Sequence, residues 1–169
     1  NNFYPLGKSS VGEVVTLQGN DYAIGDVDSF DASNANLTIF AAGSSVAKKH
    51  AESYVKKGCY VIDLSSEFRY HDEIPLVIPE INGDILDNLE EPTLIANPNC
   101  STSQLLMALK PIHDKFNIHF LNIATYQAVS GTGKEAVEEL KEQIANVNSE
   151  PKVYPKKIGF NALPQCDVF

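Results

Sequence analysis

Residues 37–64, LTIFAAGSSVAKKHAESYVKKGCYVIDL, decide the fold class, because two apolar runs flank a stretch with helical spacing. The first run, 37–43, indicates a buried strand that ends at a glycine. A helix is predicted over about 46–57, closed by Gly58. The second run, 59–64, indicates another buried strand. A strand, a helix and a strand in this order form a parallel pair with a right-handed crossover.

The alternation of strands and helices continues toward the C-terminus. The predicted elements are an edge strand over 75–79, a short helix over about 82–89, a strand over 93–96, a helix over 101–115, a longer strand over 118–129 and a helix over 134–147. This order predicts an α/β class with a mostly parallel sheet over residues 1–99. The longer strand indicates part of an α+β domain over residues 100–169, so we place a domain boundary near residue 99.

Single residues mark two helix ends. Ser44 and Ser45 are candidate N-caps of the first helix, because a serine hydroxyl accepts from the free N–H groups there. Pro111 is expected to kink or end the helix over 101–115, since proline has no N–H to donate.

Composition and charge narrow the class of partner. The chain is 43% hydrophobic and 21% charged, as in ordinary soluble globular proteins. Its net charge of −9, from 22 acidic and 13 basic residues, argues against nucleic-acid or anionic membrane binding. No apolar run suits a transmembrane helix, and no signal peptide is visible. We expect a small-molecule partner, and a chain that is processed, cut or partial because it begins at Asn1.

The cysteines and histidines show no metal-ligand pattern, so no metal is predicted. Cys59, Cys100 and Cys166 are too widely spaced for a disulfide framework, which favours a reducing cytoplasm. Cys59 begins a buried strand and is interpreted as structural, as is Cys166.

None of the four histidines is assigned as a catalytic base. His50 and His113 are predicted on solvated helix faces, and His119 starts a strand and can point either way. His71 has no ligand partner at metal-binding spacing.

Cys100 follows the turn Asn97-Pro98-Asn99 and directly precedes a helix. The positive end of the helix dipole and the free N–H groups favour thiolate over thiol at this position. The same N–H groups are suited to hold a developing oxyanion. The placement suits acyl transfer through a thioester, whereas the alternative is a small buried hydrophobic residue.

Two further segments are candidates for anion recognition. Arg69 is the only arginine among the 13 basic residues, and a guanidinium binds phosphate or carboxylate through paired N–H groups. The stretch 125–134, TYQAVSGTGK, ends a predicted strand in a glycine-rich turn that can bring N–H groups to a phosphate. A surface arginine and an ordinary strand-to-helix turn are the alternatives.

Six segments carry a resemblance to a known family. They are SSEFR at 65–69, PLVIPEIN at 75–82, NPNCST at 97–102, ALKPIHD at 108–114, TYQAVSGTG at 125–133 and FNALPQCDVF at 160–169. Together they resemble bacterial aspartate-semialdehyde dehydrogenase, in order and over nearly the whole chain. The ordered set is much more specific than any one segment.

The resemblance implies NADPH-dependent reduction of L-aspartyl 4-phosphate to L-aspartate 4-semialdehyde with release of phosphate. It implies a role in making lysine, threonine, methionine and diaminopimelate. It also implies a Rossmann-like NADP-binding domain followed by the start of a catalytic and dimerisation domain, in a homodimer or homotetramer.

The resemblance also assigns roles to single positions. Cys100 matches the acyl-thioester nucleophile, Gln127 the glutamine that orients the substrate, and Arg69 the phosphate-binding arginine. Asn99 matches the asparagine beside the nucleophile. The positions that match cofactor contacts are Ser9, Ser10, Ala42, Gly43, Ser44, Ser130 and Gly131. The family often has an arginine where Ser9 stands, which loosens the preference for NADP over NAD at that position.

Two parts of the family pattern are absent. The first strand and its Gly-x-x-Gly-x-x-Gly turn are not present, and the histidine base and a second substrate arginine of the family would lie beyond Phe169. We therefore expect this polypeptide alone to be inactive and to bind NADP poorly. The alternatives are an enzyme similar to N-acetyl-γ-glutamyl-phosphate reductase, or a non-catalytic truncated paralogue that acts as a subunit. A piece of a normal, longer enzyme is the favoured interpretation.

Overall fold

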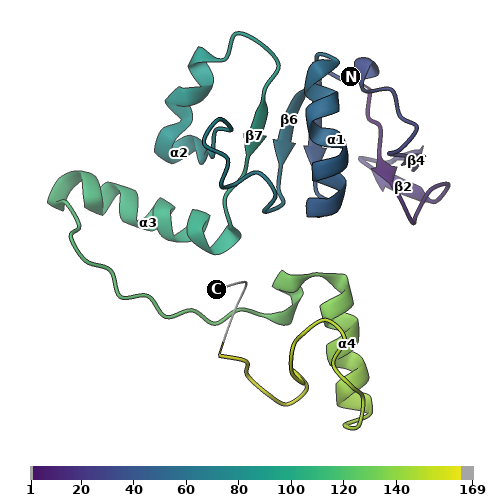
Figure 1. The fold of residues 1–169 in the computed structure, drawn as a ribbon, viewed down its shortest axis with the longest axis vertical. Coiled ribbons are helices and arrows are strands. Elements are labelled where there is room, and N and C mark those ends of the chain that lie inside the picture. The colour runs from purple at the N-terminus through teal and green to yellow at the C-terminus, as the bar shows by residue number, and fades with distance from the viewer. Residues whose placement is uncertain (1, 165–169) are drawn as a thin grey trace. The chain divides into compact units, whose positions relative to one another are not determined.

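The computed structural model describes residues 2–164, and the chain divides into two compact units between Ile118 and His119 (Figure 1). The strands are β1 (Leu6–Gly7), β2 (Val14–Leu17), β3 (Asn20–Ala23), β4 (Gly25–Asp26), β5 (Leu37–Phe40), β6 (Tyr60–Asp63) and β7 (Leu94–Ala96). The α-helices are α1 (Ser44–Lys56), α2 (Pro79–Asn82), α3 (Cys100–Phe116) and α4 (Lys134–Ala145). Short 3₁₀ segments are η1 (Ala32–Asn34), η2 (Gly83–Asn88) and η3 (Val129–Thr132).

Strands β5, β6 and β7 form one sheet in that order, and they are parallel, as the sequence predicts (Figure 1). Val61 lies at the centre of the register, opposite Thr38 on one side and Leu94 on the other. Helix α1 connects β5 to β6, so the predicted strand–helix–strand unit is confirmed. The parallel arrangement brings the carboxyl ends of all three strands to the same edge of the sheet.

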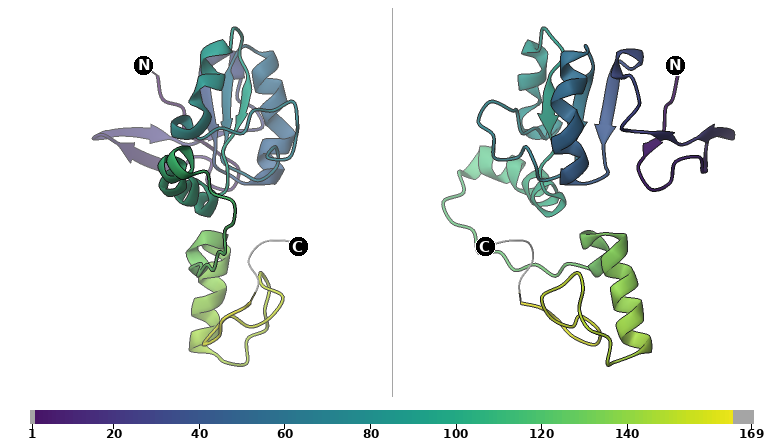
Figure 2. Two further views of the ribbon diagram at one scale, coloured as in Figure 1. Left: turned by 90° about the vertical axis from the view of Figure 1, so that its left-hand side faces the viewer. Right: turned by 45° about the vertical axis from the view of Figure 1, so that its right-hand side comes forward.

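Helix α1 covers one face of this sheet and encloses the core (Figure 2). The buried core residues are Ala32, Phe40, Ala47, Ala51, Tyr54, Cys59, Val61, Phe68, Leu94 and Ala96. The contributions of α1 follow the spacing i, i+4, i+7, which places them on one stripe of the helix. The opposite sheet face is less covered: Ile39 on it is 58% exposed, whereas Ile62 and Ile95, in register with it, are half-buried.

A hairpin near the N-terminus was not predicted. Strands β2 and β3 pair antiparallel around the two-residue turn Gln18-Gly19, where both residues have positive φ. Positive φ at both central positions is the geometry of a type I′ turn, which matches the twist of the flanking strands. The signal was present in the Val-Val-Thr-Leu run of β2, which ends two residues before the next strand.

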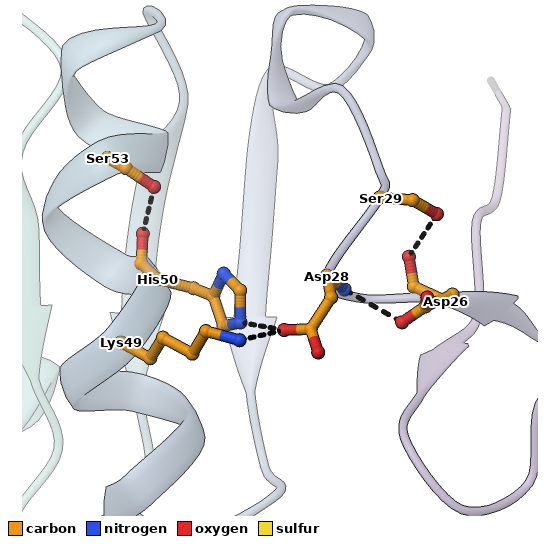
Figure 3. A network of polar contacts seen from close by, with 6 residues as sticks. All are labelled: Asp26, Asp28, Ser29, Lys49, His50 and Ser53. Carbon is orange, nitrogen blue, oxygen red and sulfur yellow. Dashed lines mark hydrogen bonds and ion pairs between the residues drawn. The ribbon is translucent and has the colours of Figure 1, made fainter.

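An ionic network ties the segment after β4 to helix α1 (Figure 3). The Asp28 carboxylate accepts from Lys49 Nζ at 2.5 Å and lies 2.9 Å from His50 Nε2. The prediction of a solvated His50 is wrong, since its side chain is only 12% exposed. The sequence pattern of α1 alone does not show that Asp28, 22 residues earlier, covers this face. His113 is exposed, as expected.

The predicted helix and strand ends need three corrections. Gly43 and not Ser44 or Ser45 is the N-cap of α1, because its φ of 87° starts the helix from a glycine-only conformation. The edge strand over 75–79 reduces to a single bridge between Leu76 and Ala96, and Pro79 instead begins α2. The short helix predicted over 82–89 is therefore α2 followed by η2.

Pro111 does not end α3. The helix continues to Phe116 and stops at Asn117, which is left-handed with a φ of 56° and donates its N–H to the His113 carbonyl. A left-handed residue of this kind is a common helix terminator, and asparagine adopts it more readily than most residues. The cost of the missing proline N–H is thus tolerated inside the helix.

The strand predicted over 118–129 is wrong. Residues 117–128 have no regular secondary structure, and Phe120 among them is 82% exposed. Alternating apolar and polar residues make a strand only where a neighbouring strand accepts and donates their backbone hydrogen bonds. No segment of the described chain pairs with this one.

The second unit is organised around helix α4. Glu139 accepts from the N–H groups of Lys152 at 2.6 Å and Val153 at 2.5 Å, and is only 4% exposed. Gln143, one turn later, accepts from the N–H groups of Ile158 and Gly159. Two polar side chains of one helix therefore hold the loop that follows it. No helix among the described residues is long and apolar enough to cross a membrane.

Replacement of Asp28 by Asn should remove part of the acid dependence of stability. The hydrogen bond from Lys49, its charge and the nearby His50 hold the pKa of Asp28 below its usual value. A lowered folded-state pKa contributes stability that is present above the unfolded pKa and is lost as pH falls through the folded one. We expect the free energy of unfolding, measured with urea from pH 6 down to pH 3, to fall less steeply with decreasing pH for Asp28→Asn than for the wild type. Asp72→Asn, at an exposed site without an ion pair in residues 2–164, is the control and should leave this pH dependence unchanged.

Replacement of Glu139 by Gln should loosen the loop over 152–154. Burial alone would raise the pKa of Glu139, but hydrogen bonds from backbone N–H groups, Val153 and Lys152 first, and from the Gln143 side chain lower it. The stability that this carboxylate contributes is therefore lost as pH falls through its folded-state pKa. We expect Glu139→Gln to cost about 1–3 kcal/mol and to speed amide exchange at Lys152 and Val153. Glu138→Gln, on the exposed face of α4, should cost less than about 0.5 kcal/mol; equal exchange rates in the two variants would contradict the assignment.

Candidate active site

Three loops meet at the carboxyl edge of the β5–β6–β7 sheet. They are residues 41–43 after β5, 64–69 after β6 and 97–99 after β7. Ser44 Oγ, directly after the first loop, lies 3.2 Å from Ser66 Oγ in the second loop. Arg69 Nε donates to the Asn97 carbonyl at 2.9 Å, which joins the second loop to the third. Crevices beyond the carboxyl ends of parallel strands are the usual ligand sites of open α/β sheets.

Cys100 is the first residue of α3 and is exposed. The helix is capped by Asn99, whose side-chain oxygen accepts from the Ser101 N–H at 2.8 Å. The Ser103 N–H and hydroxyl both donate to the Asn99 carbonyl. In the described chain this leaves the N–H groups of Cys100 and Thr102 without a protein acceptor. A thiol beside free N–H groups at a helix start is suited to nucleophilic attack on a carbonyl.

Arg69 is partly buried and makes no ion pair with the described residues. Its Nε donates to the Asn97 carbonyl at 2.9 Å and its Nη2 to the Leu64 carbonyl at 3.2 Å. The positive charge of the guanidinium is therefore not neutralised by a carboxylate. A cation held by neutral carbonyls remains available to an anion, and the role of Arg69 in phosphate binding stays a prediction.

The loop Ala42-Gly43-Ser44, which is predicted to contact the cofactor, leads into the start of α1. Gly43 has a φ of 87° and provides no side-chain cap to α1, so the first-turn N–H groups of this 13-residue helix have no side-chain acceptor from the cap. The space beside Gly43 is open, since a Cβ at this position would meet no atom within 4 Å. Backbone N–H groups at such a helix start are suited to an anion or a carbonyl oxygen.

Gln127, Ser130 and Gly131 lie in the second unit. The Gln127 amide packs over Gly131, where an added Cβ would come within 3.0 Å of Gln127 Nε2. Gly131 donates its N–H to the Ala128 carbonyl, and Ser130 is exposed within η3. The Gln127 side chain is exposed and lies against this turn. The role of the three residues in binding substrate or cofactor stays a prediction.

Ser9 and Ser10 lie in the connection between β1 and β2. Ser10 accepts from the Glu13 N–H through its carbonyl, and its hydroxyl lies against Gly7. Within residues 2–164, no hydrogen bond joins either serine to the Gly43 loop. Their predicted contact with a cofactor phosphate therefore stays a prediction.

The other predicted cysteines have different outcomes. Cys59 is fully buried, with its sulfur 3.0 Å from Thr38 Oγ1, so its structural role is confirmed. Cys166 lies outside the described residues. No group of three or more His, Cys, Asp or Glu residues in the described part of the chain is arranged to hold a metal ion.

Sequence reasoning missed Asp63 and Ser65. Asp63 ends β6, is fully buried, and accepts from the Ser65 N–H at 3.0 Å and hydroxyl at 2.7 Å. The pattern Asp-x-Ser directly after a buried strand was the available signal, because a carboxylate often closes a turn onto the residue two positions later.

Family models match both parts of the chain. The model for the semialdehyde dehydrogenase NAD binding domain matches residues 4–89, and the model for the semialdehyde dehydrogenase dimerisation domain matches residues 109–169. The chain belongs to the semialdehyde dehydrogenase family. The resemblance inferred from the ordered sequence segments is therefore confirmed at the level of the family.

Two relatives within this family have the same enzyme name. Aspartate-semialdehyde dehydrogenase of Shewanella violacea is 49% identical over 171 residues, which cover 98% of this chain and 51% of that relative. The enzyme of the same name from Legionella pneumophila is 46% identical, over 99% of this chain and 50% of the relative. The chain thus spans about half the length of the curated relatives that it matches.

A solved structure shares the fold closely. Aspartate semialdehyde dehydrogenase II from Vibrio cholerae, complexed with ASA, matches with a TM-score of 0.92 and 37% sequence identity. The match covers 100% of this chain and 52% of that chain. The α/β, Rossmann-like class predicted from the sequence of this semialdehyde dehydrogenase family member is confirmed.

Alkylation should separate Cys100 from Cys59. We expect iodoacetamide at neutral pH to label Cys100 readily and Cys59 slowly, because only Cys100 is exposed. Asn99→Ala should slow labelling of Cys100 by roughly two- to fivefold, since loss of the cap frays the first turn of α3. Mass spectrometry of the tryptic peptides reads both rates in one sample. Equal rates at Cys59 and Cys100 would contradict the site.

Proposed function

We propose that the protein containing this chain reduces L-aspartyl 4-phosphate to L-aspartate 4-semialdehyde with release of phosphate. The observation that carries the proposal is the exposed Cys100 at the capped start of α3, on the sheet edge that also presents Arg69. The substrate class in this proposal is taken from the names of the relatives described above. The pathways that would follow are the synthesis of lysine, threonine, methionine and diaminopimelate.

The reaction begins at Cys100. Its thiolate attacks the acyl carbon, and the unbonded N–H groups of Cys100 and Thr102 are placed to receive the oxyanion. The carbon–oxygen bond to phosphate breaks, phosphate leaves as a protonated dianion, and the acyl group remains on Cys100 as a thioester. Arg69 holds the phosphate through donors that its two carbonyl partners leave free.

The remaining steps regenerate the Cys100 thiolate. NADPH, when bound, supplies a hydride to the thioester carbon. The thiohemiacetal then collapses, the carbon–sulfur bond breaks, and the semialdehyde leaves the Cys100 thiolate. Gln127 orients the substrate carbonyl, and Asn99 fixes the start of α3 as well as contacting the substrate. The family's histidine acts as the acid and base, as the resemblance implies.

The cofactor in this proposal is NADP. The N–H groups at the start of α1, in Ala42-Gly43-Ser44, suit its phosphate or nicotinamide amide. Ser130 and Gly131 form a second cofactor contact, and Ser9 and Ser10 beside Lys8 meet the 2′-phosphate.

The activity is assigned to the complete protein. Because the chain spans about half the length of its relatives, we propose that these 169 residues alone do not turn over. The match to a dimerisation domain supports a homodimer or homotetramer. The free thiols of Cys59 and Cys100 suit a reducing cytoplasm.

The test is phosphate-dependent formation of NADPH from aspartate semialdehyde by the protein expressed at the full length of its gene. Cys100→Ala should lower kcat by at least about 10⁴-fold, because the covalent route is lost. Arg69→Lys should raise the KM for phosphate by about tenfold or more, since the lysine ammonium lacks the planar, paired N–H groups of the guanidinium.

Two controls sharpen this experiment. Lys156→Gln, a charge removed from an exposed lysine of the second unit without an ion pair in residues 2–164, should change neither constant. N-acetylglutamate semialdehyde should be a poor substrate. Turnover of that compound in preference to aspartate semialdehyde, or full activity of Cys100→Ala, would overturn the proposal.

A further inference from the structure

Arg69 is oriented by contacts that converge on one buried residue. Its two acceptors are the carbonyls of Leu64 and Asn97, which belong to loops after different strands. Leu64 directly follows Asp63 in the chain, and the Asn97 N–H donates to the Asp63 carbonyl at 2.9 Å. Both acceptors of the guanidinium are thus held next to Asp63.

The Asp63 side chain closes the turn that contains Leu64. Its Oδ1 accepts from the Ser65 N–H at 3.0 Å and its Oδ2 from the Ser65 hydroxyl at 2.7 Å. The Ser65 hydroxyl oxygen in turn accepts from the Glu67 N–H at 3.2 Å. A chain of three hydrogen bonds therefore fixes the backbone from the end of β6 to within two residues of Arg69.

The burial of the Asp63 carboxylate costs desolvation free energy. Its side chain is fully buried and has no ion-pair partner within the described chain. A buried carboxylate is expensive to desolvate unless hydrogen bonds or charges compensate. Among residues 2–164, the hydrogen bonds that compensate this carboxylate come from Ser65, which lies in the loop that leads to Arg69. An apolar residue would fill the same position at lower cost but would not close the turn.

We propose that Asp63 and Ser65 are positioning residues, which hold the Arg69 guanidinium in the orientation that receives the phosphate. The inference rests on the proposed function only for the identity of the anion. No hydrogen bond within residues 2–164 joins either side chain to the guanidinium, so each acts through the carbonyls that Arg69 contacts. Disruption of the turn frees the guanidinium to rotate and weakens phosphate binding without changing the arginine itself.

The single arginine of this chain makes a direct test possible. In ¹⁵N-labelled protein of 169 residues, Arg69 gives one Nε–H signal, which should exchange slowly with water because Nε donates to Asn97. Titration with inorganic phosphate should shift this signal and yield a Kd. Asp63→Asn should speed exchange and raise the Kd by about tenfold, the effect of losing hydrogen bonds of a buried charged group.

Matched variants separate positioning from general destabilisation. Ser65→Ala should reproduce the effect, and Ser65→Thr, which keeps the hydroxyl, should restore slow exchange and the wild-type Kd. Glu67→Gln is the control, because it changes an acid on the same loop whose side chain pairs with Lys48 at 3.0 Å and leaves the turn intact. Folding of each variant is checked from its amide spectrum.

Each outcome has a defined meaning. The proposal is overturned if folded Asp63→Asn and Ser65→Ala both keep slow Nε–H exchange and the wild-type Kd, or if Glu67→Gln is equally affected. It is also overturned if the wild-type Nε–H exchanges freely. If phosphate does not shift the wild-type signal, the phosphate role of Arg69 under the proposed function fails. Exchange at Nε–H in the variants then still decides whether Asp63 positions the arginine.

Discussion

The parallel register of β5, β6 and β7 is the constraint on which the candidate site depends. It brings the ends of three strands to one edge, so residues that are far apart in the chain become neighbours there. The hydrogen bond from Arg69 to Asn97 spans 28 residues and exists only because β6 and β7 pair side by side. A shift of the register by one residue would exchange the buried and open faces and separate these loops.

Helix α1 maintains this register by burying one face of the sheet. Its stripe of small and aromatic residues packs on Phe40, Val61 and Leu94, and the same helix begins at the Gly43 loop. Packing and function are therefore coupled in one element, because the residues that bury the core also set where the N–H groups of the first turn lie. The Asp28 network fastens α1 to the segment after β4.

Local pattern was enough to predict the strand–helix–strand unit, the start of α3 beside Cys100 and the buried Cys59. In each case the deciding interaction lies within a few residues, or follows from apolar periodicity alone. The strand over 118–129 failed for the opposite reason, since a strand needs a partner that a local pattern cannot supply. His50 failed likewise, because its neighbour Asp28 comes from another part of the chain.

The sequence by itself determined the class of fold, the position of the candidate nucleophile at a helix start and the one arginine available to an anion. These properties depend on the order of residue types and on short-range hydrogen bonds such as the cap from Asn99. Only the tertiary structure decided that Asp63 is buried, that its turn orders the loop before Arg69 and that the guanidinium is held by two carbonyls. The physical reason is that burial and long-range hydrogen bonds arise when strands pair, and no local pattern specifies which distant groups will meet.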